Sequence, residues 1–101
     1  MLASFSVVPI GTGTGLKEQV AEILRVVDAS GLPYRIHAMT TEVEGEWDRV
    51  MAVVKAAHDV GRRYSGRALT TIIIDDREGA TGRIEGKVQD VEQILGTRGA
   101  R

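Results

Sequence analysis

Hydrophobic and polar positions alternate along three stretches of the chain, and this alternation predicts β-strands. Residues 2–8 alternate apolar side chains with serines. Residues 69–74, within ALTTIIIDD, are rich in β-branched side chains and give the strongest strand prediction. Residues 34–43 alternate as well, but they are long for one strand. They form either one strand or two strands joined by a tight reversal or bulge near Thr40–Thr41.

Three other stretches repeat their apolar residues at the three- and four-residue spacing of an α-helix. They cover residues 16–29, 46–64 and 84–95. Their apolar stripes consist of Leu16, Val20, Ile23, Leu24 and Val27; of Trp47, Val50, Met51, Val54, Ala57 and His58; and of Ile84, Val88, Val91, Ile94 and Leu95. Gly31 and Gly96 are expected to end the first and third helices.

The resulting order of elements is β-α-β-(β)-α-β-α, which predicts an α+β fold. The first two helices can each bury a stripe only against a shared surface, so both are expected on one face of the sheet. This is the ferredoxin-like βαββαβ arrangement with an antiparallel sheet, extended by a C-terminal helix. The length of 101 residues suits one domain. We expect a ligand-binding domain over residues 1–96 and a disordered tail over residues 97–101.

Side-chain parity along the strands predicts which residues occupy the second face of the sheet. The residues expected to face the helices are Phe5, Val7, Ile36, Ala38, Ile72 and Ile74. The residues expected on the other face are Ser4, Ser6, Val8, His37, Met39, Leu69, Thr71 and Ile73. This second set mixes apolar bulk with hydroxyl groups and is too apolar for plain solvent-exposed surface. It suits a subunit interface that contains a small-molecule pocket.

Composition excludes several classes of function. The net charge of −1 argues against a nucleic-acid-binding protein, which usually carries a basic patch. The chain has no cysteine, and His37 and His58 lack a metal-ligand spacing, so no metal site is expected. No apolar run approaches the ~20 residues of a membrane span. The N-terminus carries no signal-peptide pattern, which predicts a cytoplasmic protein.

The segment Gly11–Gly15, GTGTG, follows a strand and precedes a helix, as many phosphate-binding loops do. Its spacing matches neither the phosphate-loop motif nor the G-x-G-x-x-G motif, because Leu16 stands where the third glycine is needed. We therefore interpret it as a turn that forms one wall of a pocket. The free N–H groups of the following helix can still receive an anion there.

Three segments, SVVPIGTGTG, YRIHAMTTEVEGEWDRVMAVVKAAH and TTIIIDDR, resemble the small family of ferredoxin-like thiamine-binding proteins. The resemblance extends from Phe5 to about Leu95. It implies a non-catalytic domain that binds thiamine, or its hydroxymethylpyrimidine part, as a ligand rather than a cofactor. It also implies a homodimer or homotetramer assembled through the sheets. One departure is Thr40, where the family usually has Gly or Asn; a β-branched residue resists positive φ, so the chain is expected to turn differently there.

A thiamine-like ligand needs a slot for flat rings, partners for the aminopyrimidine edge, and negative or π character near its cationic thiazolium. Hydroxyl groups, soft apolar walls, one imidazole, one carboxylate and backbone groups near the glycine loop supply these features. The candidate ligand-binding residues are Ser6, Val8, Ile10, Gly11, Thr12, His37, Met39, Thr41, Glu44, Thr71 and Ile73. Glu44 is the carboxylate that the family motif favours for an amino group or cation; alternatively, it only prepares the start of the second helix.

Other classes of function find less support in the sequence. An enzyme on this fold would need a base or nucleophile with an orienting partner, and His37 with Glu44 is the only pair worth naming. We therefore expect no catalysis. RNA binding would need aromatic residues on the open strands, where this chain has serine, threonine and aliphatic residues. A regulatory oligomeric sensor for another small ligand stays open.

Overall fold

The computed structural model of the chain describes residues 1–11 and 17–96. The elements follow one another in the predicted order. They are β1 (Leu2–Pro9), α1 (Lys17–Ala29), β2 (Tyr34–Ile36), β3 (Thr41–Glu44), α2 (Trp47–Tyr64), β4 (Ala68–Asp75) and α3 (Arg83–Leu95). The predicted tail at 97–101 and the predicted helix start at Leu16 lie outside the described residues.

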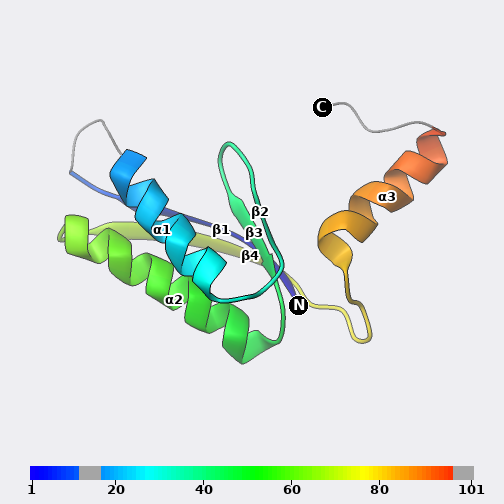
Figure 1. Cartoon of the computed structure of the whole chain (residues 1–101), viewed down its shortest axis with the longest axis horizontal. Helices are drawn as coiled ribbons and strands as arrows, with labels where there is room; N and C mark the ends of the chain where they lie inside the picture. Colours follow the sequence, from blue (N-terminus) through cyan, green and yellow to red (C-terminus); the bar gives the residue numbers. More distant parts are fainter. Residues whose placement is uncertain (12–16, 97–101) are drawn as a thin grey trace.

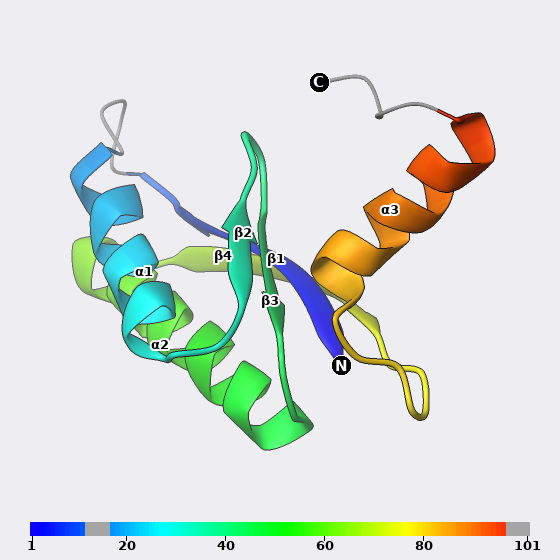
Figure 2. The same cartoon turned by 45° about the vertical axis from the view of Figure 1, so that its right-hand side comes forward.

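The strands form one antiparallel sheet in the order β2-β3-β1-β4, and α1 and α2 lie side by side on one of its faces (Figures 1 and 2). This order confirms the predicted ferredoxin-like arrangement. The segment 34–43 consists of two strands, so the one-strand alternative is wrong. The chain reverses between β2 and β3, where the N–H of His37 donates to the carbonyl of Thr40 at 2.8 Å. Thr40 does not adopt positive φ, which agrees with the turn expected of a β-branched residue.

The hydrophobic core lies between the sheet and the two packed helices. Its largest fully buried side chains are Phe5, Val27, Val43, Val50 and Val60. Burying side chains of this kind contributes about 1.5–3 kcal/mol each, so this layer provides most of the stability.

Gly61 brings α2 into close contact with β1. A Cβ atom at Gly61 would lie 2.7 Å from Cγ1 of Val7, so only glycine fits here without a shift. α2 continues past Gly61 to Tyr64.

Some helix residues assigned to the core from periodicity lie at the surface. Val20 and Trp47 are exposed, whereas Gln19 is buried. The buried line of α1 runs through residues 19, 23 and 27, which rotates Val20 out of the contact with the sheet. Tyr64 is also exposed, and its hydroxyl donates to Glu22 Oε2 at 2.7 Å and so joins α2 to α1.

α3 stands apart from this two-layer body and projects from one end of the sheet (Figures 1 and 2). Of its residues only Ile84 is buried. The radius of gyration of 14.9 Å exceeds the ~13 Å expected for a compact chain of this length, which agrees with a projecting helix. Gly31 and Gly96 have φ values of 75° and 71° just beyond α1 and α3, as the sequence predicts.

Candidate functional site

The face of the sheet turned away from α1 and α2, called the open face below, carries the expected mixture of hydroxyl and apolar side chains. Ser6 of β1 lies directly opposite Thr71 of β4, and Val8 lies opposite Leu69. Val8, Leu69 and Ile73 are all exposed. The register confirms the orientation predicted for Ser4, Ser6, Val8, Leu69, Thr71 and Ile73.

Glu42 is a carboxylate on this face that the sequence analysis missed. Glu42 lies between Ser4 of β1 and Arg35 of β2 in the register of the sheet. Its Oε1 lies 3.0 Å from Nε2 of His37, whose side chain therefore reaches the open face from the turn between β2 and β3. Once β3 is recognised as a separate strand, side-chain alternation places Glu42 on the same face as Glu44, two residues further along. Alternation could therefore have identified Glu42 as a candidate.

Glu44 has a structural task that the sequence analysis did not anticipate, while its ligand contact stays a prediction. Its two carboxylate oxygens accept the N–H of Arg83 at 2.9 and 3.0 Å, and Oε1 also accepts the N–H of Ile84 at 3.2 Å. The carboxylate thus accepts hydrogen bonds from the first N–H groups of α3, and its negative charge interacts favourably with the positive end of the helix dipole. The alternative prediction placed Glu44 at the start of α2, whereas its carboxylate contacts the start of α3.

Two further candidates lie away from the open face. Thr41 is opposite Phe5, is buried, and faces the helices. Met39 is 87% exposed in the turn between β2 and β3, and Ala38, expected to face the helices, is exposed in the same turn. The orientations expected for Met39 and Ala38 assumed strand alternation through residues where the chain reverses, whereas Thr41 was chosen for its hydroxyl group.

The candidates at the end of β1 are Ile10, Gly11 and Thr12. The N–H of Ile10 donates to the carbonyl of Arg67 at 2.8 Å, and the carbonyl of Ile10 accepts the hydroxyl of Ser65. The backbone groups of Ile10 are therefore used to join β1 to the start of β4. Gly11 has a φ of 87° and begins the turn toward α1. Thr12 lies outside the described residues.

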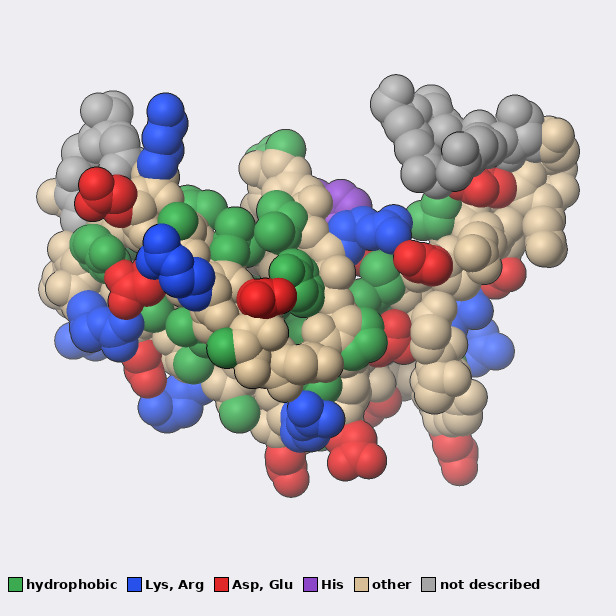
Figure 3. Space-filling view, in the orientation of Figure 1, with side chains coloured by type: hydrophobic (Ala, Val, Ile, Leu, Met, Phe, Trp, Pro, Cys, Tyr) green, Lys and Arg blue, Asp and Glu red, His purple; other side chains and the backbone are tan. Residues whose placement is uncertain are grey.

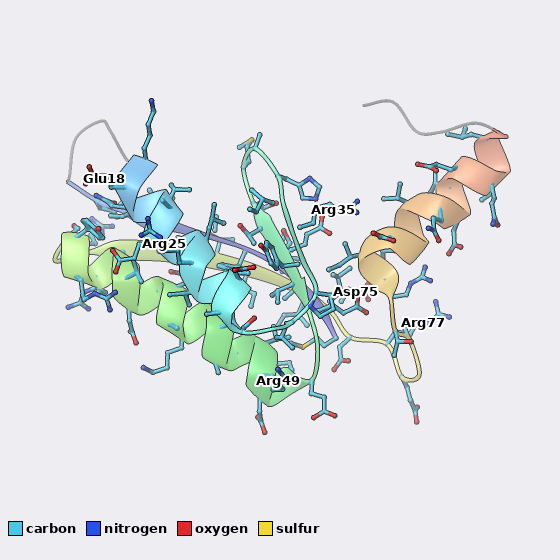
Figure 4. All side chains as sticks on the ribbon, viewed as in Figure 1. Glu18, Arg25, Arg35, Arg49, Asp75 and Arg77 are labelled. Carbon is cyan, nitrogen blue, oxygen red and sulfur yellow. The ribbon has the colours of Figure 1, made fainter. Side chains whose placement is uncertain are left out.

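A cavity of about 760 Å³, called the junction cavity below, lies where β2, β3, α2 and α3 come together. Its lining includes Tyr34, Arg35, Glu46 and Arg49 (Arg35 and Arg49 are labelled in Figure 4). Both arginines already have partners: Arg35 pairs with Glu85 at 3.1 Å, and Arg49 donates to the carbonyl of Ser30. The Tyr34 hydroxyl donates to Asp28 at 2.9 Å, and this hydrogen bond raises the pKa of Tyr34.

Metal sites and membrane spans are both absent from the part of the chain that the structure describes. Residues 1–11 and 17–96 hold no group of three or more histidine, aspartate or glutamate side chains arranged for a metal ion. None of the helices within these residues has the length and apolar character to cross a membrane.

A family model described as thiamine-binding protein matches residues 3–92. The chain belongs to the thiamine-binding protein family. Among relatives, it is 43% identical over 96 residues to a UPF0045 protein of Mycobacterium bovis, with 94% of each chain covered. It is 31% identical to the UPF0045 protein YqgV of Bacillus subtilis, with 93% of this chain and 96% of the relative covered.

Solved structures agree with this membership of the thiamine-binding protein family. A hypothetical protein from Methanocaldococcus jannaschii superposes with a TM-score of 0.83 at 26% identity, covering 91% of this chain and 95% of the other. A Thermotoga maritima protein provisionally assigned to thiamine biosynthesis or salvage superposes with a TM-score of 0.77 at 27% identity, covering 89% and 96%. The fold and the family expected from the sequence are both confirmed.

Proposed function

We propose that this protein is a non-catalytic, cytoplasmic binding protein for thiamine or its hydroxymethylpyrimidine part. The ligand lies on the open face, where a second copy of the chain covers it. Membership of the thiamine-binding protein family over residues 3–92 carries the proposal. The Thermotoga maritima protein of the same fold, provisionally assigned to thiamine biosynthesis or salvage, supports the same class of ligand.

The hydroxyl groups of Ser6 and Thr71 are suited to the edge of an aminopyrimidine. They belong to directly opposed residues of β1 and β4, and the Cβ atoms of such a pair lie ~4.5–5.5 Å apart. Each hydroxyl can donate or accept, so the pair can meet both a ring nitrogen and an amino group. Val8 and Ile73 flank the pair and supply an apolar floor for a flat ring.

Glu42 supplies the negative charge that a thiazolium cation or an exocyclic amino group needs. It lies one strand away from Ser4 on the same face, and its side chain is partly exposed. The His37 contact restricts the position of the carboxylate. Glu42 therefore takes the role that the sequence assigned to Glu44.

The junction cavity is the second place where the same ligand can lie, because it is already hollow in a single chain. The variants Thr71→Val and Thr81→Val separate the two locations. Each removes one hydroxyl at nearly constant volume; Thr71 lies on the open face and Thr81 lines the junction cavity.

Calorimetric titration with thiamine and with hydroxymethylpyrimidine tests the proposal. We expect Thr71→Val to weaken binding about tenfold, the effect of losing ~1.4 kcal/mol, and Thr81→Val to leave it unchanged. The reverse result would move the ligand to the junction cavity. No heat and no thermal shift at millimolar concentrations of either compound would refute thiamine-class binding. Breakdown of thiamine during incubation, followed by chromatography, would contradict the absence of catalysis.

A further inference from the structure

The junction cavity has an apolar floor formed by side chains that are themselves buried. Leu32 and Ile84 both line the cavity, and they are 6% and 8% exposed. Met1 and Pro33 add apolar surface beside them. The volume of about 760 Å³ lies within the ~300–1,000 Å³ of small-molecule sites, whose walls bury the apolar part of a ligand. In the space-filling view, hydrophobic side chains gather between the two-layer body and α3, with charged side chains beside them (Figure 3).

Two side chains of opposite charge line the same cavity at the start of α2. Glu46 immediately precedes the helix, and Arg49 lies in its first turn; both are exposed. Residues three apart at the start of a helix are neighbours on one side of it. The cavity thus combines a buried apolar floor with a carboxylate and a guanidinium at its rim.

Both rim charges keep unused capacity for binding. The Glu46 carboxylate makes no hydrogen bond or ion pair with any residue that the structure describes, and it does not cap α2. Arg49 donates to the carbonyl of Ser30 at 3.1 Å, but within residues 1–11 and 17–96 no carboxylate pairs with it. A guanidinium carries five N–H donors, so most of those of Arg49 are available to a ligand.

The other charged side chains of the wall already have partners. Arg35 pairs with Glu85 at 3.1 Å, and the Glu44 carboxylate accepts the first N–H groups of α3. A molecule that enters the cavity therefore meets one available carboxylate and one available guanidinium beside an apolar floor. Thiamine offers a cation for the carboxylate but no anion for the guanidinium of Arg49. A zwitterion with an apolar side chain matches all three features.

We propose that the junction cavity is a second binding site, which takes a free α-amino acid with a large apolar side chain. The ammonium group of the ligand pairs with Glu46, and its carboxylate accepts N–H groups of Arg49, whose fork geometry suits a carboxylate. The apolar side chain lies on Leu32 and Ile84. None of these four residues belongs to the open face, so the inference is independent of thiamine binding there.

Calorimetric titration with L-leucine tests the site, together with three compounds that each lack one feature of leucine. N-acetyl-leucine lacks the ammonium group, leucinamide lacks the carboxylate, and alanine lacks most of the side chain. Each compound that lacks a charge should bind about fivefold more weakly than leucine, as expected for the loss of one exposed ion pair. Alanine should bind about tenfold more weakly, because it buries less apolar surface.

Two variants show which residue meets which group of the ligand. Glu46→Gln should weaken leucine binding about fivefold and leave the affinity for N-acetyl-leucine unchanged. Arg49→Gln should weaken leucine and N-acetyl-leucine alike and leave the affinity for leucinamide unchanged. A change that only disturbed the shape of the cavity would weaken every ligand to the same extent, so this pattern identifies direct contacts.

Asp48→Asn and Arg62→Gln are the matched controls for the two variants. Both residues are exposed on α2 and outside the lining of the cavity, so leucine binding should not change. Circular dichroism should show an intact fold for all four variants, because all four positions are exposed.

Three results would each overturn the proposal. They are no binding of leucine, methionine or phenylalanine at millimolar concentration, equal weakening of all ligands by both cavity variants, and displacement of leucine by thiamine. The outcomes for the two proposals are distinct. Leucine binding without thiamine binding would support this site and refute the proposed function, and thiamine binding without binding of any of the three amino acids would do the reverse.

Discussion

On one face of the sheet Phe5 is 2% exposed, and on the other Ile73, the residue next to Phe5's partner Ile72 on β4, is 69% exposed. The same strands form both faces, because successive side chains along a strand point to opposite faces of the sheet. The helix-covered face is filled by α1 and α2 of the same chain. The open face carries hydroxyl groups and apolar side chains that the described residues leave exposed. Stability is thus concentrated on one face, and the recognition proposed above belongs to the other.

The largest effect that separates the two faces is expected from Phe5→Ala. The change leaves a cavity in the core and should lower the free energy of unfolding by about 3–5 kcal/mol, measured by urea denaturation. Ser6→Ala, the next residue on the other face, is the control and should stay within about 0.5 kcal/mol of the unaltered protein. Equal losses for both variants would contradict the division of the two faces.

A smaller effect is expected where the open face meets α3. Glu44→Gln keeps the shape of the side chain but removes the charge that holds the first N–H groups of α3, and hydrogen bonds to charged groups are worth about 1.5–3 kcal/mol. Amide hydrogen exchange, followed by mass spectrometry, should accelerate in α3 and stay unchanged in α2. Acceleration throughout the protein would mean that Glu44 supports the core instead.

The smallest effect concerns the pair formed by Lys87 and Asp75. The hydrogen bond and charge of Lys87 hold the pKa of Asp75 below its usual value of 3.8. A carboxyl whose pKa is lowered by folding contributes stability above its unfolded pKa, and this contribution is lost as the pH falls through the folded pKa. The pair is exposed to solvent, so its contribution to the stability of the protein is small.

We therefore expect the backbone NMR signals of α3 to shift toward those of a frayed helix as the pH falls below 3.8, the usual pKa of Asp75. In Asp75→Asn the part of this shift that depends on the Asp75 carboxyl should be absent. Identical acid titrations of α3 in both proteins would show that the pair does not hold the helix.

The strands that are long in sequence were predictable down to the orientation of their side chains. β1 and β4 each alternate without interruption, so parity alone placed Ser6 and Thr71 on the open face. The same reasoning failed for Ala38 and Met39, because the chain reverses after β2 and resets the alternation. A three-residue strand such as β2 is too short to give a periodic signal of its own.

The role of Glu44 was beyond the reach of local patterns. Its partners, Arg83 and Ile84, lie 39 and 40 residues further along the chain. Nothing in the spacing around TEVEG indicates that a helix from the end of the chain begins there. The projection of α3 away from the sheet was likewise hidden, since its periodicity resembles that of a helix packed against its own sheet.

The two edges of the sheet have unequal consequences for the behaviour of the chain in crowded solution. β2 ends the sheet with three residues, too few to template another strand, whereas β4 presents eight residues with no proline and no lysine. Unpaired backbone groups on a long, apolar edge invite strand addition by any extended chain. Charged residues bracket this edge at Arg67 and Asp76, and such flanking charges discourage uncontrolled growth of a sheet. The short length of β2 therefore protects one edge against aggregation, and the charged residues at the two ends of β4 protect the other.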